Sequence, residues 1–209
     1  RIPTRLWSAT LVALLALSAS ASQQDASRAG AVIRVGAGGN LQAALDRARP
    51  GDTILLAQGV RFKGSFVLPA HPGTTFITVR TDGEGLPGPG VRTSPRYADA
   101  LAELQSPDNR PALRTAPRAH HWRIENVAFG PNRNGDGNVI ELGDAATTVR
   151  DEIPHTLVLD RVYLHGDPEI GQKRGIALNS AATEIINSHI SDIKSTGFDT
   201  QAIWGWNGP

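Results

Sequence analysis

The chain has 209 residues, with 21 Lys and Arg against 20 Asp and Glu, so it has no strong charge to attract nucleic acid or an anionic membrane. It contains no cysteine, which excludes disulfides, a thiol nucleophile and cysteine metal sites. The 22 glycines and 14 prolines favour turns and short strands over long helices.

The first 21 residues have the pattern of a secretory signal peptide. Arg1 and Arg5 precede the apolar run 11–17, and residues 19–21 (Ala-Ser-Ala) have the form of a cleavage site. The run is short for a membrane span, although a buried helix or an anchor is the alternative. We expect a secreted or periplasmic protein with no membrane span after cleavage. Removing the signal takes away two arginines and no acid, so the formal charge changes from +1 to −1.

After a predicted flexible tether at 22–30, the first half contains short strands and one helix. Residues 31–35 are a β-branched stretch, and similar strands are predicted at 53–56, 64–68 and 75–80. Asn40 is a good N-cap for a helix whose apolar residues recur at helical spacing until Pro50. Signals weaken from 81 to 121. We interpret this segment as an insertion with one helical turn near 97–105, and a linker between domains is the alternative.

The second half contains an internal repeat. The segments "IENVAF" (124–129), "LDRVYL" (159–164) and 185–190 share one pattern, and each is followed by a second strand. From the first apolar residue to the second strand the intervals are 16, 17 and 18 residues, from Ile124 to Ile140, Leu159 to Ile176 and Ile185 to Ile203.

Repeats of this length indicate a solenoid, a propeller or an array. The units are too short for the four antiparallel strands of a propeller blade. Stacking each strand on its counterpart one repeat later gives parallel sheets with apolar positions inward, which is a parallel β-helix over 31–209. The early helix would cover the end of the apolar core and the unpaired edge of the first coil. Residues 201–204 occupy the second-strand position of the third repeat. We therefore expect the sequence to stop before the solenoid does, leaving an apolar edge exposed.

The segments "VGAGGNLQAALDRARPGDTILLAQGVRFKGSFVL", "DRVYLHGD", "RGIALNS" and "SHISDIKSTGFDTQAI" resemble the right-handed parallel β-helix, or pectate-lyase-like, superfamily. The resemblance covers most of 31–209 and implies an all-β, right-handed parallel β-helix with an N-terminal capping helix. Members include polysaccharide lyases and polygalacturonases. The second half looks most like a group of secreted bacterial members without an assigned activity.

β-Elimination of a uronic acid requires a cation, often Ca²⁺, to neutralise the carboxylate and a Lys or Arg to accept the proton. Calcium prefers several carboxylate oxygens. Charged residues gather in the loops 165–174 and 192–199, which stacking would bring together. The candidate catalytic residues are His165, Lys173, Arg174 and Lys194, and the candidate Ca²⁺ ligands are Asp167, Glu169, Asp192 and Asp199. The alternative for each residue is a solvated, salt-bridged turn.

Two closer resemblances hold only in part. "GFDTQAI" resembles the polygalacturonase segment with paired aspartates, but Phe198 stands at the first position and Asp199 at the second. Inverting hydrolysis therefore lacks one carboxylate. "GNVIELGD" resembles a strand of alginate and chondroitin lyases, with Glu141 where that family has arginine.

Other polar and aromatic residues have structural alternatives. Asn126, Asn179 and Asn187 fit left-handed turns or backbone hydrogen bonds better than catalysis. His120 and His121 suggest a metal pair only weakly, because neighbours in a strand point to opposite faces. Trp204 and Trp206 share a face if that segment is extended, and they form either a sugar-binding platform or part of the core.

Two functions remain open from the sequence. One is a lyase-like enzyme on acidic polysaccharide that uses the two charged loops. The other is a non-catalytic surface or carbohydrate-binding β-helix in which the loops are only turns. An enzyme requires a partly buried Lys or Arg among convergent acids, whereas a binding module requires a shallow aromatic face.

Overall fold

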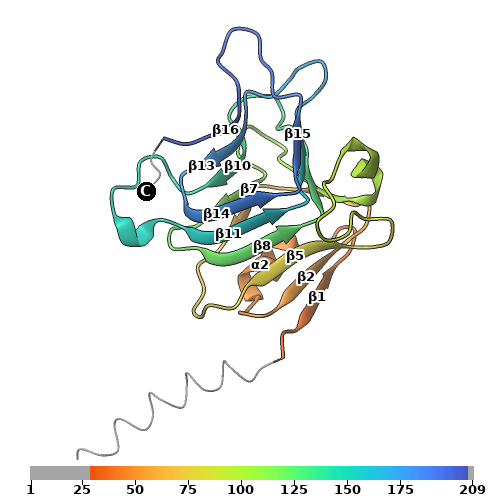
Figure 1. The fold of residues 1–209 in the computed structure, drawn as a ribbon, viewed down its shortest axis with the longest axis vertical. Helices are drawn as coiled ribbons and strands as arrows, with labels where there is room; N and C mark the ends of the chain where they lie inside the picture. The colour runs from red at the N-terminus through yellow and green to blue at the C-terminus, as the bar shows by residue number, and fades with distance from the viewer. Residues whose placement is uncertain (1–28, 207–209) are drawn as a thin grey trace, which may run out of the picture.

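The computed structural model describes residues 29–206, whose strands form three parallel β-sheets (Figure 1). Sheet A contains β1 (Val32–Val35), β2 (Thr53–Ala57), β5 (Ile77–Asp82), β8 (His120–Glu125), β11 (His155–Asp160) and β14 (Ala181–Ile186). Sheet B contains β3 (Arg61–Lys63), β6 (Ala102–Gln105), β9 (Val127–Phe129), β12 (Tyr163–His165) and β15 (His189–Ser191). Sheet C contains β4 (Phe66–Leu68), β7 (Leu113–Thr115), β10 (Asn138–Leu142), β13 (Arg174–Leu178) and β16 (Gln201–Trp204). The predicted signal peptide lies outside the described residues.

From β2 onward, the chain passes through sheets A, B and C in turn, and each strand pairs in parallel with its counterpart one coil later. The predicted repeat is confirmed residue for residue. Leu159 is in register with Ile124 and Ile185, and Ile176 is in register with Ile140 and Ile203. The fold is therefore a parallel β-helix, as predicted.

The core consists of apolar side chains that stack along the solenoid. In sheet A, one such row contains Ile54, Val79, Ile124 and Leu159, each at most 2% exposed. Full burial of such a side chain stabilises a fold by roughly 1.5–3 kcal/mol. Because each row continues from coil to coil, the core holds neighbouring coils in one register.

The single α-helix of the described residues, α2 (Leu41–Arg47), covers one end of this core. The Asn40 side chain accepts a hydrogen bond from the Ala43 amide at 2.9 Å, and the helix buries Leu41, Ala44 and Leu45. Gln42 also exchanges two hydrogen bonds with Val67 of β4, the first strand of sheet C. The helix thus covers both the core end and a sheet edge, as predicted.

A left-handed residue forms the corner between sheets A and B in three successive coils. Asn126, Arg161 and Asn187 have φ values of 50°, 55° and 51°. The structural interpretation of Asn126 and Asn187 is therefore confirmed. The Asn179 side chain also has a structural role, because it accepts a hydrogen bond from the Trp206 amide at 2.8 Å.

The segment 81–121 differs from the prediction. It contains two solenoid strands, β6 and β7, so the insertion is limited to 83–101 and contains the 3-10 helix η1 (Pro95–Ala100). The short strand β3 was also missed. These strands have only three or four residues, which is too short for alternation to stand out from a loop. A second 3-10 helix, η2 (Arg150–Glu152), precedes β11.

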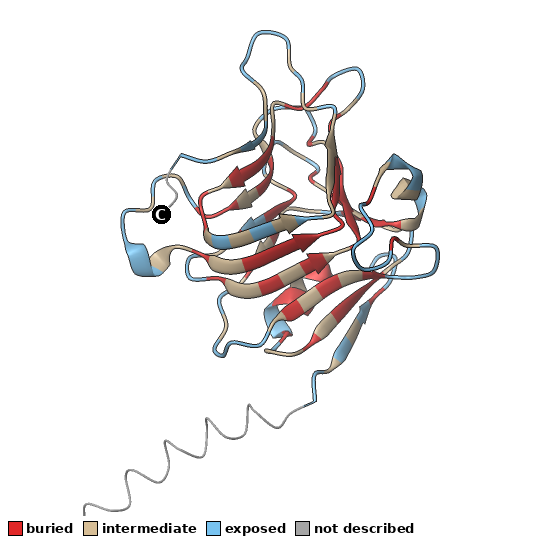
Figure 2. Ribbon diagram, in the orientation of Figure 1, coloured by how far each residue is buried: buried red, intermediate tan, exposed pale blue. Residues whose placement is uncertain are grey.

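Burial decreases at the last coil. The middle strands are mostly buried, whereas β14 alternates between half-buried and exposed residues (Figure 2). Ile203 of β16 is 44% exposed, so the predicted apolar edge is present. Within residues 29–206, no helix has the length and apolar character needed to cross a membrane.

Candidate functional site

The loops that join sheet B to sheet C stack on one another in the last three coils. These B-to-C loops comprise residues 130–137, 166–173 and 192–200. The Gln172 amide donates to Lys194 O at 2.9 Å, and the Lys173 amide donates to Gly135 O at 2.7 Å. The predicted stacking of the two charged loops is confirmed, and both project from the solenoid at the top of Figure 1.

Gly171 allows this close approach. It has φ +83°, and a Cβ at this position would lie 2.0 Å from the Lys194 carbonyl oxygen. A side chain would therefore strain the backbone and push the two loops apart. The contact that brings the charged residues together depends on this glycine.

The candidate residues fall into two groups on opposite sides of the loops. Lys173 and Arg174 lie at the start of β13 on the sheet C side, where Arg174 contacts Trp204. His165 ends β12 on the sheet B side, where it and Lys194 contribute to the electrostatic environment of Asp167. The stacking therefore does not gather all the predicted residues into one cluster.

On the sheet C side, two cations lie against two aromatic rings from the next coil. Lys173 Nζ is 4.3 Å from the Phe198 ring centroid, and Arg174 Cζ is 4.3 Å from the Trp204 ring centroid. Lys173 Nζ also lies 3.7 Å from Asp136 Oδ1. We call Lys173, Arg174, Phe198 and Trp204 the cation–aromatic ledge. Its cations and rings combine a charge for acidic groups with flat apolar surfaces.

Hydrogen bonds hold the Trp204 side of the ledge in place. Trp204 Nε1 donates to Asn138 Oδ1 at 2.9 Å, and Asn138 Nδ2 donates to Glu141 Oε2 at 3.0 Å. Arg174 Nε donates to Gln201 Oε1 at 3.2 Å. Strand β13 lies between β16 and β10. Its Ala177 is in register with Trp204, and this small side chain leaves room for the indole. The ring and the guanidinium are thus positioned without a ligand.

On the sheet B side, Asp167 organises its own loop. Its Oδ1 accepts hydrogen bonds from the Ile170 and Glu169 amides, both at 2.8 Å. These hydrogen bonds are the main reason that the pKa of Asp167 lies below its ordinary value, and the charges of His165 and Lys194 lower it further. The His165 ring stacks on Tyr163 with centroids 5.0 Å apart. Tyr163 is in turn buried beneath the insertion 83–101, against Tyr97 and Ala98.

The predicted calcium ligands do not fit calcium as they are arranged. In the part of the chain that the structure describes, no three His, Asp or Glu side chains come together as a metal site. Oδ1 of Asp167 is occupied by two backbone amides, while Glu169, Asp192 and Asp199 are exposed.

The two terminal tryptophans differ in their surroundings. Trp204 is half-buried in the ledge, whereas Trp206 is 80% exposed and lies beyond the end of β16. The condition that both belong to one extended strand is therefore not met. Trp204 has a defined place in the candidate site, and Trp206 stays a prediction.

The expectation that His120 and His121 point apart is wrong. His121 has φ +54°, which interrupts the strand alternation, and the two Nδ1 atoms lie 2.9 Å apart. Thr156 and Ala182 have the same left-handed conformation at the start of the next two strands of sheet A. The fold therefore imposes this bend, and it brings two adjacent imidazoles together.

Two ledge partners were not identified from the sequence. Phe198 was named only at the position of a catalytic aspartate, and Asp136 was not singled out. Stacking the loop 130–137 beneath 166–173, as the repeat implies, would have brought Asp136 beside Lys173. No comparable sequence signal identifies Phe198, because its position depends on the path of the loop 192–200.

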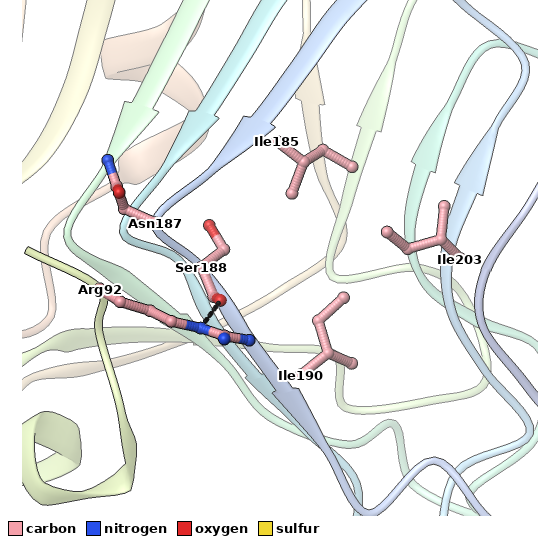
Figure 3. A pocket seen from close by; sticks show the side chains of 6 residues that line it. All are labelled: Arg92, Ile185, Asn187, Ser188, Ile190 and Ile203. Carbon is pink, nitrogen blue, oxygen red and sulfur yellow. Dashed lines mark hydrogen bonds between the residues drawn. The ribbon is translucent and has the colours of Figure 1, made fainter. Parts of the chain in front are cut away.

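The hollow in Figure 3 lies at the open end of the core. It is lined by Ile185, Ile190 and Ile203, one from each strand of the last coil, whose side chains converge (Figure 3). Arg92 of the insertion reaches its rim and donates to Ser188 O at 3.0 Å. Because these isoleucines are the inward residues of the last coil that the structure describes, the hollow is continuous with the described core, and its apolar lining offers little catalytic chemistry.

Comparison with known proteins gives one informative likeness. The chain matches no protein-family model, and no curated protein matches its sequence. Among solved structures, the crystal structure of an alginate lyase from Paenibacillus sp. str. FPU-7 matches with a TM-score of 0.54 and 25% sequence identity. The match covers 76% of this chain and 44% of the lyase, so the chain corresponds to less than half of that enzyme.

Proposed function

We propose that this protein acts on acidic polysaccharide as a polysaccharide lyase, with the cation–aromatic ledge as its substrate-binding surface. One observation carries the proposal. Two adjacent cations, Lys173 and Arg174, are each stacked on an aromatic ring contributed by the next coil. The alginate lyase that shares the fold supports the substrate class.

The ledge provides the two kinds of contact that an acidic sugar requires. The Arg174 guanidinium has a planar set of donors suited to binding a carboxylate through two hydrogen bonds. The faces of Trp204 and Phe198 are apolar surfaces on which a sugar ring can stack. Gln201 holds Arg174 through a single N–H, so most of its donors remain for a ligand.

In the proposed reaction, Arg174 binds the uronate carboxylate and offsets the negative charge that develops when the neighbouring C–H bond breaks. Lys173 accepts that proton after its ammonium has released one to solvent. A carbon–carbon double bond then forms as the glycosidic C–O bond breaks, and the leaving oxygen takes up a proton. His165 and Lys194 lie on the opposite, sheet B side of the loops, so water is the proposed source of that proton.

The second candidate is a carbohydrate-binding protein without catalysis. The surface has one hollow at the core end and another beside His155, and no ledge residue lines either of them. A ledge that lies outside these hollows favours binding over catalysis. Export to the cell exterior or the periplasm, expected from the N-terminal residues, suits both candidates.

Incubating the full chain with alginate, polygalacturonate and a neutral glucan separates these functions. We expect unsaturated products, detected by ultraviolet absorbance, from an acidic polymer alone. Arg174→Gln should lower the rate at least ten-fold, whereas Arg47→Gln, an exposed change on α2, should leave it unchanged. Binding of acidic polymer without unsaturated products would support the binding protein and contradict the lyase. No interaction with either acidic polymer would overturn both.

A further inference from the structure

Four of the six histidines in the chain gather where sheet C turns into sheet A, away from the ledge. His120 lies at the centre, with ring centroids 4.9 Å from His71, 5.0 Å from His121 and 5.1 Å from His155. We call these four residues the imidazole cluster. The proposed function does not use any of them.

The cluster is assembled by the solenoid. His120 and His155 occupy equivalent positions in β8 and β11, so their rings stack with an interplanar angle of 12°. His121 joins them because its left-handed backbone turns its ring to the same side. His71 comes from the preceding turn and packs against His120 and Trp122.

The two closest nitrogens have the spacing of a chelating pair. Nδ1 of His120 and Nδ1 of His121 are 2.9 Å apart. When two nitrogens each lie about 2.0–2.1 Å from one ion, their separation depends on the nitrogen–metal–nitrogen angle. It is about 2.9 Å for a right angle and about 3.3–3.4 Å for a tetrahedral angle. The spacing therefore fits a square-planar or octahedral ion, the geometries that Cu²⁺ and Ni²⁺ prefer with nitrogen ligands.

We propose that the imidazole cluster binds a divalent transition-metal ion, Cu²⁺ above all, with Nδ1 of His120 and Nδ1 of His121 as its chelating pair. Without the ion, the same spacing fits a hydrogen bond in which one Nδ1–H donates to the other Nδ1. On binding, the donating ring shifts its proton to Nε2, so the metal replaces the shared hydrogen. As placed, the described residues do not provide a third His, Asp or Glu ligand, so water completes the coordination.

The surroundings suit a neutral imidazole pair. Burial, followed by the charges of the neighbouring imidazoles, lowers the pKa of both His120 and His121. His71 Nε2 is buried without a hydrogen-bond partner, so the cluster contains a further nitrogen whose contacts are incomplete. The chain also lacks cysteine and methionine, so no sulfur ligand competes for the ion.

The test uses the full chain and CuCl₂ alone, with calorimetry for affinity and electron paramagnetic resonance for the ligand atoms. We expect one Cu²⁺ per chain, with splitting from at least two nitrogens. His121→Asn should weaken binding at least ten-fold, and because Asn tolerates the left-handed conformation, it preserves the turn. The control, His189→Asn on the outer face of sheet B, should bind within about two-fold of the unchanged protein.

Equal affinity in the unchanged protein and His121→Asn, or a spectrum with one nitrogen or none, would overturn the proposal. His120→Gln provides a second variant at a regular strand position, should His121→Asn fail to fold. The spectrum of the unchanged chain requires no substitution at all.

Discussion

Gln42 of the capping helix and Val67 of β4 exchange two hydrogen bonds, with Gln42 Nε2 donating to Val67 O at 3.0 Å and the Val67 amide donating to Gln42 Oε1 at 2.8 Å. The amide side chain thus takes the place of a neighbouring strand at the first strand of sheet C. It satisfies a sheet edge that would otherwise be left unpaired.

Gln42→Leu should therefore lower the free energy of unfolding by about 1–3 kcal/mol, because it leaves a partly buried amide and carbonyl without partners. Urea denaturation measures the change. Arg47→Gln on the exposed side of the same helix serves as the control and should alter stability by at most about 0.5 kcal/mol. Equal effects from both changes would show that the edge does not need Gln42.

The buried ion pair at the A-to-B corner predicts a larger effect. Arg161 Nη2 lies 2.7 Å from Asp160 Oδ2, and both side chains are less than a tenth exposed. Arg161→Met leaves the carboxylate buried without its cation, which should cost about 3–5 kcal/mol. Arg34→Met, which breaks an exposed pair with Asp82, should cost about 0–1 kcal/mol. Similar losses in the two urea titrations would contradict the importance of burial here.

Two alanine-to-glycine changes should shift the thermal midpoint of unfolding in opposite directions. Ala182 is exposed and has φ +47°, so Ala182→Gly removes a strain of about 1–2 kcal/mol. The greater freedom of glycine in the unfolded chain offsets about 0.4–1 kcal/mol of that gain. The net result should be a rise in thermal midpoint. Ala202→Gly, at an exposed and regular position of β16, should lower it, and changes of the same sign would refute the assigned conformation.

The loop 166–173 should loosen in acid. The folded pKa of Asp167 is below its ordinary value, so its carboxylate stabilises the loop above the unfolded pKa, near 3.9. That contribution is lost as the pH falls through the lower, folded pKa. The protection of the Glu169 and Ile170 amides, relative to the intrinsic exchange rate at each pH, should fall over this range. Asp167→Ala should show fast exchange at neutral pH, and unchanged protection in this variant would contradict the role of the carboxylate.

Much of the fold was predictable because inward positions repeat. Ile124, Leu159 and Ile185 belong to the same class of residue at the same place in each unit, so the repeat revealed the sheet register. The short strands β6 and β7 were missed since three or four residues carry little periodic signal. The bend at His121 was missed because the turn into sheet A imposes it whatever the residue, as Thr156 and Ala182 show at the equivalent positions.

The site was only partly predictable, because the repeat shows which loops stack but not which side of a loop each residue faces. Lys173 and Arg174 were identified from their charged loop and Trp204 as a possible sugar-binding aromatic, and stacking places Arg174 against Trp204. Their separation from His165 and Asp167 depends on which side of the loops each residue faces. That choice is made by the turn around Gly171 and by packing against Tyr163, which the sequence pattern does not specify.

The indole N–H resonance of Trp204 provides the most direct test of the ledge. The chain has four tryptophans, of which Trp122 is buried beneath the imidazole cluster and serves as the internal control. Acidic uronate oligosaccharide should shift the Trp204 signal in a saturable way and leave Trp122 unchanged, while a neutral oligosaccharide should shift neither. An unmoved Trp204 signal with the acidic ligand, or equal shifts with the acidic and neutral ligands, would contradict recognition of acidic polysaccharide at the cation–aromatic ledge.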